Sequence, residues 1–390
     1  MKYNFDQINN RRNTNSLKWD IGEHEFPMWV ADMDFQTAPA VTQAIQKRAE
    51  SGIFGYNIVP DNWYDAITGW WEKRHQTHFQ KEWLIFCTGV IPAITTAVQR
   101  LTNVGDNVVI QTPVYDIFFH SVENHGRHVL ENALHYDEQT HEYSMDFEDL
   151  EEKLADPLTT MMILCNPQNP VGKIWTKEEL VRIGNLCKKY HVTVVADEIH
   201  CDITEPGKSY VPFISVNEEC RENCVTCISA TKAFNIAGLQ SSAVVIPDEM
   251  LRQKMERGLN SNEVAEPNCF AIDSVIAAFT QGEEWLEELR EYISGNRKLV
   301  AEYLEKEIPE ISLVKGDCTY LLWIDCSGVT KNADELCQFI RSKTGLYLTA
   351  GSQYRGVSKA FIRMNVACPK VQVEHSLGLF KDGIIGFMHQ

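Results

Sequence analysis

The sequence predicts an α/β protein built around a mostly parallel sheet that helices cover on both faces. From Trp83 onward, segments with a strand pattern alternate with segments whose apolar residues have helical spacing. The strand segments are unbroken apolar runs, which are typical of parallel strands buried on both faces. With 390 residues, 44% of them hydrophobic, the chain is long enough for a large core and two subdomains.

The expected elements follow in order along the chain. The first forty or so residues are polar and then turn-like around 25–35, and two helices with apolar residues at helical spacing come next. The alternating region follows them, and an α+β region completes the chain. The predicted helices are 40–50, 63–75, 92–101, 177–190, 284–306 and 333–343, and the predicted strands are 84–87, 107–110, 160–165, 192–196, 225–228, 242–246 and 320–325.

The long helix that begins after Glu283 is expected to leave the large domain. We therefore predict a large domain over residues 47–283 and a small domain made of residues 1–46 together with 284–390. No internal repeat, low-complexity segment or Pro/Gly/Ser-rich linker divides the chain.

Charge and cysteine content exclude several classes of protein. A net charge of −18 argues against binding to nucleic acid or to anionic membrane surfaces, because both require clustered Lys and Arg. We expect neither a signal peptide nor a membrane span, since no apolar run approaches roughly 18 residues. The 12 cysteines are therefore expected to be reduced, in a cytoplasmic protein. Cys224 and Cys227 have CxxC spacing within a predicted strand, and no second pair completes a metal site.

A lysine follows the apolar run 225–228 at the place where α/β sheets bind their ligands. Lys232 lies in the stretch 229–238, just past the carboxyl end of this predicted strand. Burial there would lower the pKa of its amine and make the nitrogen available for a Schiff base. A lone lysine is more often a solvated surface residue, so the hypothesis depends on what the other strand ends contribute.

Three other strand ends carry polar groups. Gly89 opens a helix, and the free N–H groups of Val90 and Ile91 would suit a phosphate, although many such turns contain glycine. The loop 165–172 is made rigid by two prolines and a glycine and carries two asparagines; it could also be an ordinary loop. Asp197 ends a strand that is apolar on both faces, so its charge needs a partner such as a protonated ring nitrogen, unless it only caps the next helix.

Together, these strand ends match the needs of one cofactor. The Ser229 hydroxyl, three residues before the lysine, could share a phosphate with the glycine turn. A phosphate cradle, an anion for a pyridine nitrogen, an amide beside the ring and a Schiff-base lysine are the groups that pyridoxal 5'-phosphate requires.

On these motifs the chain resembles the fold-type I pyridoxal-phosphate enzymes of the aspartate aminotransferase superfamily. It is most similar to the cystathionine β-lyase-like C–S lyases typified by MalY, PatB and cystalysin. The resemblance covers nearly the whole chain, and it implies a large domain with a mostly parallel seven-stranded sheet, plus a smaller α+β domain. The segments that carry it are 28–35, 52–56, 88–92, 112–115, 166–172, 197–200, 229–238 and 363–365.

The resemblance also implies roles for individual residues at the cofactor. Lys232 would attach the cofactor and then act as the base at Cα, and Asp197 would pair with the pyridinium nitrogen. Asn169 would bond the ring oxygen, and Tyr115, otherwise a core aromatic, would stack on the ring. The further cofactor-binding residues would be Ser229, Val90, Ile91 and His200.

Three more residues follow from the resemblance. Arg363 would grip the substrate α-carboxylate as a bidentate fork, with Ala31, Asn169 and Tyr115 also at the substrate. Tyr56 would reach the phosphate and take part in catalysis in the neighbouring subunit, which implies a homodimer with shared sites.

The implied reaction is α,β-elimination from an S-substituted L-cysteine, such as cystathionine or a cysteine S-conjugate, to a thiol, pyruvate and ammonia. Many superfamily members have an arginine eight residues after the lysine, where this chain has Gln240, and aminotransferases commonly have a tyrosine where it has His200. Both differences favour a lyase. An aminotransferase would use the same residues, and a regulator that binds pyridoxal phosphate and acts by protein contact is the alternative from another class.

Overall fold

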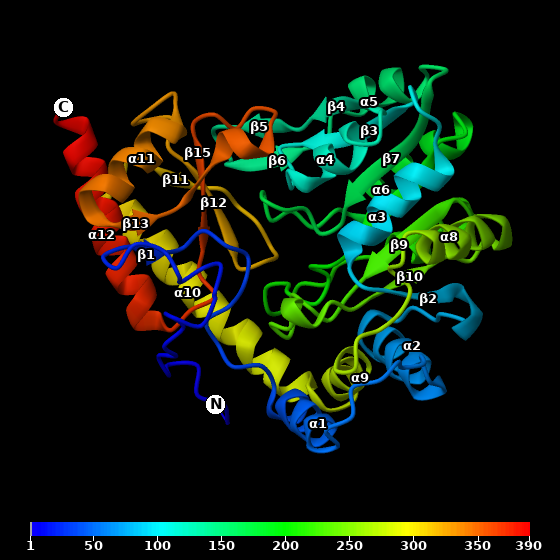
Figure 1. The fold of residues 1–390 in the computed structure, drawn as a ribbon. Coiled ribbons are helices and arrows are strands. Elements are labelled where there is room, and N and C mark those ends of the chain that lie inside the picture. Colours follow the sequence, from blue (N-terminus) through cyan, green and yellow to red (C-terminus); the bar gives the residue numbers. More distant parts are fainter. Residues whose placement is uncertain (1) are drawn as a thin grey trace.

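A seven-stranded sheet lies at the centre of the larger part of the chain, in a computed structural model that describes residues 2–390 (Figure 1). Only one strand, β10, runs antiparallel to its neighbours in this sheet, so the predicted mostly parallel seven-stranded sheet is confirmed. In spatial order its strands are β2 (Leu84–Cys87), β10 (Ser242–Val245), β9 (Cys224–Ile228), β8 (Thr193–Asp197), β7 (Thr159–Cys165), β3 (Asn107–Thr112) and β4 (His128–Ala133).

Two hydrophobic cores cover the two faces of this sheet, because successive side chains of each strand point to opposite sides. In β7, Met161 and Ile163 pack into one core, whereas Met162 and Leu164 pack into the other. The first core contains side chains of α3 (Val90–Leu101), α4 (Ile117–Glu123) and α8 (Glu249–Ser261). The second contains side chains of α2 (Asp61–His75), α5 (Phe147–Leu154), α6 (Lys177–Lys189) and α9 (Ala271–Gln281).

The carboxyl-terminal part of the chain forms a separate α+β layer. Its four-stranded antiparallel sheet packs with the end of α10 (Glu283–Glu307), with α11 (Ala333–Thr344) and with α12 (Lys370–Met388) around a third core. Figure 1 shows α10 as the long rod that leads from the large sheet to this layer. The strands, in spatial order, are β11 (Ser312–Leu313), β12 (Leu321–Asp325), β15 (Phe361–Asn365) and β14 (Thr349–Ala350).

The amino-terminal segment lies against both parts. β1 (Phe26–Pro27) pairs in parallel with β13 (Leu346–Tyr347) of the α+β layer, and α1 (Pro39–Glu50) packs on α9 of the large part. The division at residues 46/47 and 283/284 stays a prediction. The remaining strands form the hairpin β5 (His135–Asp137) and β6 (Glu142–Ser144), and the remaining α-helix is α7 (Glu218–Glu222). Across residues 2–390, no helix combines the length and the apolar character that crossing a membrane requires.

Candidate active site

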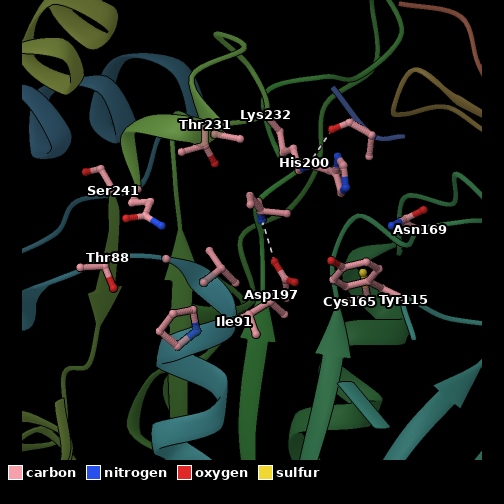
Figure 2. A pocket seen from close by; sticks show the side chains of 17 residues that line it. Thr88, Ile91, Tyr115, Cys165, Asn169, Asp197, His200, Thr231, Lys232 and Ser241 are labelled. Atoms are coloured by element: carbon pink, nitrogen blue, oxygen red, sulfur yellow. Dashed lines mark hydrogen bonds between the residues drawn. The ribbon is translucent and has the colours of Figure 1, made fainter. Parts of the chain in front are cut away.

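A cavity of about 230 Å³ opens at the carboxyl ends of β7, β8 and β9, beside the start of α3 (Figure 2). This is the edge of the sheet where the predicted strand-end motifs meet. Most of the predicted residues line it, together with several that the sequence analysis did not single out. The lining consists of Ala31, Thr88, Gly89, Val90, Ile91, Pro92, Tyr115, Cys165, Asn169, Asp197, Ile199, His200, Thr231, Lys232, Ala237, Gln240 and Ser241.

Lys232 reaches into this cavity from the loop after β9. Its Nζ donates a hydrogen bond of 2.8 Å to the carbonyl oxygen of Ala31. Burial lowers the pKa of Lys232 to about 8, and the positive charge of Arg363 adds to this effect, while Asp32 and Asp197 oppose it. A large fraction of the amine is therefore neutral near pH 8 and can act as a nucleophile or a base.

Asp197 is the last residue of β8, and its carboxyl group points into the cavity floor (Figure 2). Its side chain is buried, and Oδ1 accepts a hydrogen bond of 3.0 Å from the backbone N–H of Ile199. Burial raises the pKa of Asp197 to about 6, and the Ile199 N–H and the charge of Lys232 only partly offset it. A buried carboxylate of this kind gains stability from a cation placed beside it.

The end of the cavity beside α3, on the left in Figure 2, is rich in hydrogen-bond donors. Val90 and Ile91 occupy the first turn of α3, where backbone N–H groups have no partner within the helix. The hydroxyl groups of Thr88, Thr231 and Ser241 surround this turn. Within residues 2–390, Ser241 Oγ is buried without a hydrogen-bond partner, so it is available to a ligand. An anionic group fits this end of the cavity.

Ser229 does not line the cavity. Its hydroxyl donates to the carbonyl oxygen of Ser241 at 2.6 Å and accepts from the backbone N–H of Thr231 at 3.1 Å. Ser229 therefore holds the loop that presents Thr231 and Ser241, and these two residues face the space where the sequence analysis placed Ser229. Gln240 lines the same end with an uncharged side chain.

Arg363 lies at the other side of the site, on β15 of the α+β layer. Its Nη2 donates to the carbonyl oxygen of Trp29 at 3.0 Å, and Nη1 lies 3.5 Å from Oδ1 of Asn169. The guanidinium group packs over the ring of Tyr354 at 5.1 Å. Arg363 Nε is buried and has no hydrogen-bond partner in the part of the chain that the structure describes. This buried cation can receive a carboxylate beside Asn169.

Two ring side chains complete the walls. Tyr115 follows β3 and lines the cavity, and burial raises the pKa of its hydroxyl. His200 is buried, and burial together with the charges of Lys232 and Arg363 lowers its pKa to about 3. His200 is therefore a neutral ring at physiological pH.

Tyr56 stands apart from the residues above. Its side chain is 100% exposed, in the segment 52–59 that connects α1 to α2, and it does not line the cavity of its own chain. Ile53, Phe54 and Ile58 in the same segment are 74%, 58% and 80% exposed. A cluster of exposed apolar side chains of this kind marks an interaction surface.

Comparison with known proteins places the chain among proteins of this architecture. The family model "Aminotransferase class I and II" matches residues 26–378. The chain is 41% identical to cystathionine beta-lyase PatB of Bacillus subtilis, over 98% of both chains. The structure of cystalysin from Treponema denticola is 28% identical and matches with a TM-score of 0.95, covering 99% of this chain and all of that one. The C–S lyase of Staphylococcus hominis is 30% identical, with a TM-score of 0.91 and 98% of each chain covered. The chain therefore belongs to the aminotransferase class I and II family.

Proposed function

We propose that this protein is a pyridoxal-phosphate-dependent carbon–sulfur β-lyase that cleaves S-substituted L-cysteines. The central observation is that the amine of Lys232, with a pKa of about 8, shares one cavity with the buried carboxyl group of Asp197, and that the charge of the buried Arg363 guanidinium contributes to lowering that pKa. The similarity to proteins named cystathionine beta-lyase and C–S lyase supports the substrate class.

The residues of the cavity fit pyridoxal phosphate from end to end. The first turn of α3 and the unpartnered Ser241 hydroxyl suit its phosphate, and Asp197 suits its protonated ring nitrogen. Tyr115 would lie against the ring, and Asn169 would bond the ring oxygen. The solved structures of cystalysin and of the S. hominis C–S lyase are both described as containing this cofactor. When bound to Lys232, the cofactor supplies an electron-accepting ring that stabilises negative charge at the substrate Cα.

The chain's own residues carry out the remaining steps. Arg363 and Asn169 would hold the α-carboxylate of the substrate, and the free amine of Lys232 would remove the Cα proton. The electron pair left at Cα forms the new bond to Cβ as the Cβ–S bond breaks and the thiolate leaves. The thiolate takes up a proton to become the thiol, and one water molecule hydrolyses the remaining three-carbon fragment. One S-substituted cysteine and one water therefore yield one thiol, one pyruvate and one ammonium ion.

Product analysis without any added 2-oxo acid tests this function. L-Cystathionine and an S-alkyl-L-cysteine should each give pyruvate and free thiol in equal amounts, and the Lys232→Ala protein should give neither. If product formed only after a 2-oxo acid was added, the protein would be an aminotransferase. A biological effect that persisted in the Lys232→Ala protein would instead favour a regulator acting by protein contact.

We further propose that the active unit is a homodimer in which Tyr56 enters the partner's site. The exposed apolar segment 52–59 supports a protein interface at this place, and a C2 dimer would present each Tyr56 to the other subunit. Mixing Tyr56→Ala and Lys232→Ala proteins tests the proposal. Random exchange should restore roughly a quarter of the wild-type activity, since half the dimers would contain one intact site. No recovery in a mixture that has exchanged subunits would refute it.

We propose that the protein is located in the cytoplasm. All 12 cysteines are free, and a chain with so many thiols is suited to a reducing environment. Cell fractionation with a tagged copy checks this directly, and recovery from an oxidising compartment would contradict it.

A further inference from the structure

The backbone segment 29–33, which we call the strap, belongs to the amino-terminal part of the chain and passes beside the cavity, where Ala31 is part of the lining. Each of its five carbonyl oxygens accepts a hydrogen bond from a side chain elsewhere in the protein. The donors, in order along the strap, are Arg363 for Trp29, Asn365 for Val30, Lys232 for Ala31, Asn365 for Asp32, and Asn235 for Met33. The strap is therefore held from the α+β layer and from the lysine loop at once.

The carbonyl of Ala31 differs from the others because it serves the reactive amine. It accepts from Lys232 Nζ at 2.8 Å and from the hydroxyl of Tyr320 at 3.1 Å. Tyr320 immediately precedes β12 and is 1% exposed. Burial raises the pKa of its hydroxyl, so the group stays protonated and remains a donor. The two donors converge on one backbone oxygen from opposite parts of the fold.

The two donors differ in what happens to them during the reaction. Lys232 must leave the Ala31 oxygen when it attaches the cofactor, and it returns as a free amine when the substrate takes its place. Tyr320 does not react with the cofactor, so its hydrogen bond can persist. This bond keeps a donor on the buried Ala31 carbonyl and fixes the direction of that carbonyl. The amine then has a single defined acceptor to which it can return.

We infer that Tyr320 is a positioning residue: through the carbonyl of Ala31, it fixes where the Lys232 amine lies as nucleophile and as base. This inference rests on the proposed role of Lys232 and is independent of whether the protein eliminates a thiol or transfers an amino group. The hydrogen bonds of the described residues link Tyr320 to the lysine through the carbonyl of Ala31, and the Tyr320 ring also lies edge-on to the ring of His200, with 6.5 Å between the centroids.

Two measurements on Tyr320→Phe test the inference. The first is the rate at which cofactor-free protein covalently attaches added pyridoxal phosphate, followed by absorbance. The second is exchange of the Cα proton of L-alanine for deuterium by the holoenzyme, followed by NMR; alanine has no leaving group, so it isolates proton transfer by the base. We expect both rates to fall at least tenfold, with the KM for L-alanine changed less than twofold.

Two controls separate positioning from general damage. Tyr143→Phe removes another buried tyrosine hydroxyl that bonds a residue of β12, Trp323, and does not contact the strap; both rates should stay within twofold of wild type. In the Lys232→Ala holoenzyme rescued by added methylamine, the further change Tyr320→Phe should have no effect, because the diffusing amine does not use the Ala31 carbonyl.

Three results would overturn the inference: unchanged attachment and exchange, an equal loss in the methylamine-rescued protein, or an equal loss in Tyr143→Phe. A loss of thiol release with normal alanine exchange would also overturn it and would make Tyr320 an acid for the leaving group. Normal exchange in the wild type without any elimination would contradict the proposed lyase function but leave the inference standing.

Discussion

Replacing Asp197 with asparagine should stabilise the cofactor-free protein while it disables catalysis. The pKa of Asp197 is about 6 in the folded protein because the side chain is buried, against an ordinary value of 3.8. The folded state therefore binds the proton more tightly than the unfolded chain does. Stability falls as the pH rises from about 4 to about 6, and above this range the ionised carboxylate costs about 3 kcal/mol.

An asparagine side chain has nearly the same shape as aspartate but carries no charge, so the free-energy cost of burying an ionised carboxylate disappears. We expect Asp197→Asn to unfold at a temperature similar to wild type near pH 4. At pH 8 its melting temperature should be about 4 °C higher, for roughly 2 cal/mol/K of unfolding entropy per residue. With cofactor bound, the same variant should lose at least 100-fold in kcat, because the ring nitrogen loses its anionic partner.

Asp202→Asn is the matched control, because Asp202 is also buried but already has a cationic partner, Arg74. It bonds Arg74 Nε and His75 Nε2, each at 2.9 Å, and these partners outweigh burial and hold its pKa below the ordinary value. Its replacement should therefore destabilise the protein at pH 8, by about 3 kcal/mol. Two results would refute the view that the ionised Asp197 carboxylate destabilises the cofactor-free protein. One is an equal effect of both substitutions on stability at pH 8, and the other is a difference in melting temperature between Asp197→Asn and the wild type that does not change with pH.

Three further predictions concern the same site. Arg363→Lys should raise the KM for an S-alkyl-L-cysteine about 10- to 100-fold and change kcat less, because the bidentate fork is lost; steady-state kinetics would show this. The rate of covalent cofactor attachment by the cofactor-free protein should rise with pH through about 8, where the Lys232 amine becomes neutral, and Arg363→Gln should shift that midpoint upward. Ser241→Ala should weaken cofactor binding about tenfold in equilibrium dialysis, because Ser241 Oγ has no other partner in the described chain; unchanged affinity would remove it from the phosphate site.

The sheet could be predicted from sequence because its central strands are apolar on both faces. The run 160–165 differs from β7 by one residue at its start, and 84–87 coincides with β2. The edge strand β4 escaped detection because it has polar residues, such as His128 and Glu131, among its apolar ones. The helix α12 was not predicted either, because it contains three glycines, which have a low helix propensity. One of them, Gly383, lies where a Cβ would come 2.8 Å from Ile340, so packing on α11 decides the helix there.

The functional site, like the fold, could be predicted from the sequence only in part. Residues at strand ends, such as Asp197 and Lys232, could be placed because parallel strands bring their carboxyl ends to one edge. The direction of a side chain in a loop could not, so Ser229 was expected in the cavity, whereas its hydroxyl bonds Ser241 and Thr231. Tyr320 had no local signal at all. Its hydroxyl meets Ala31, 289 residues away, only because the amino-terminal strap folds across the α+β layer.

The most direct test of the account is the ratio of pyruvate to free thiol released from an S-alkyl-L-cysteine in the absence of any 2-oxo acid. Both products should accumulate over many turnovers in a 1:1 ratio, and an added 2-oxo acid should leave the rate unchanged. A requirement for the oxo acid, with the sulfur still attached to the product, would contradict the central claim that this site breaks the Cβ–S bond.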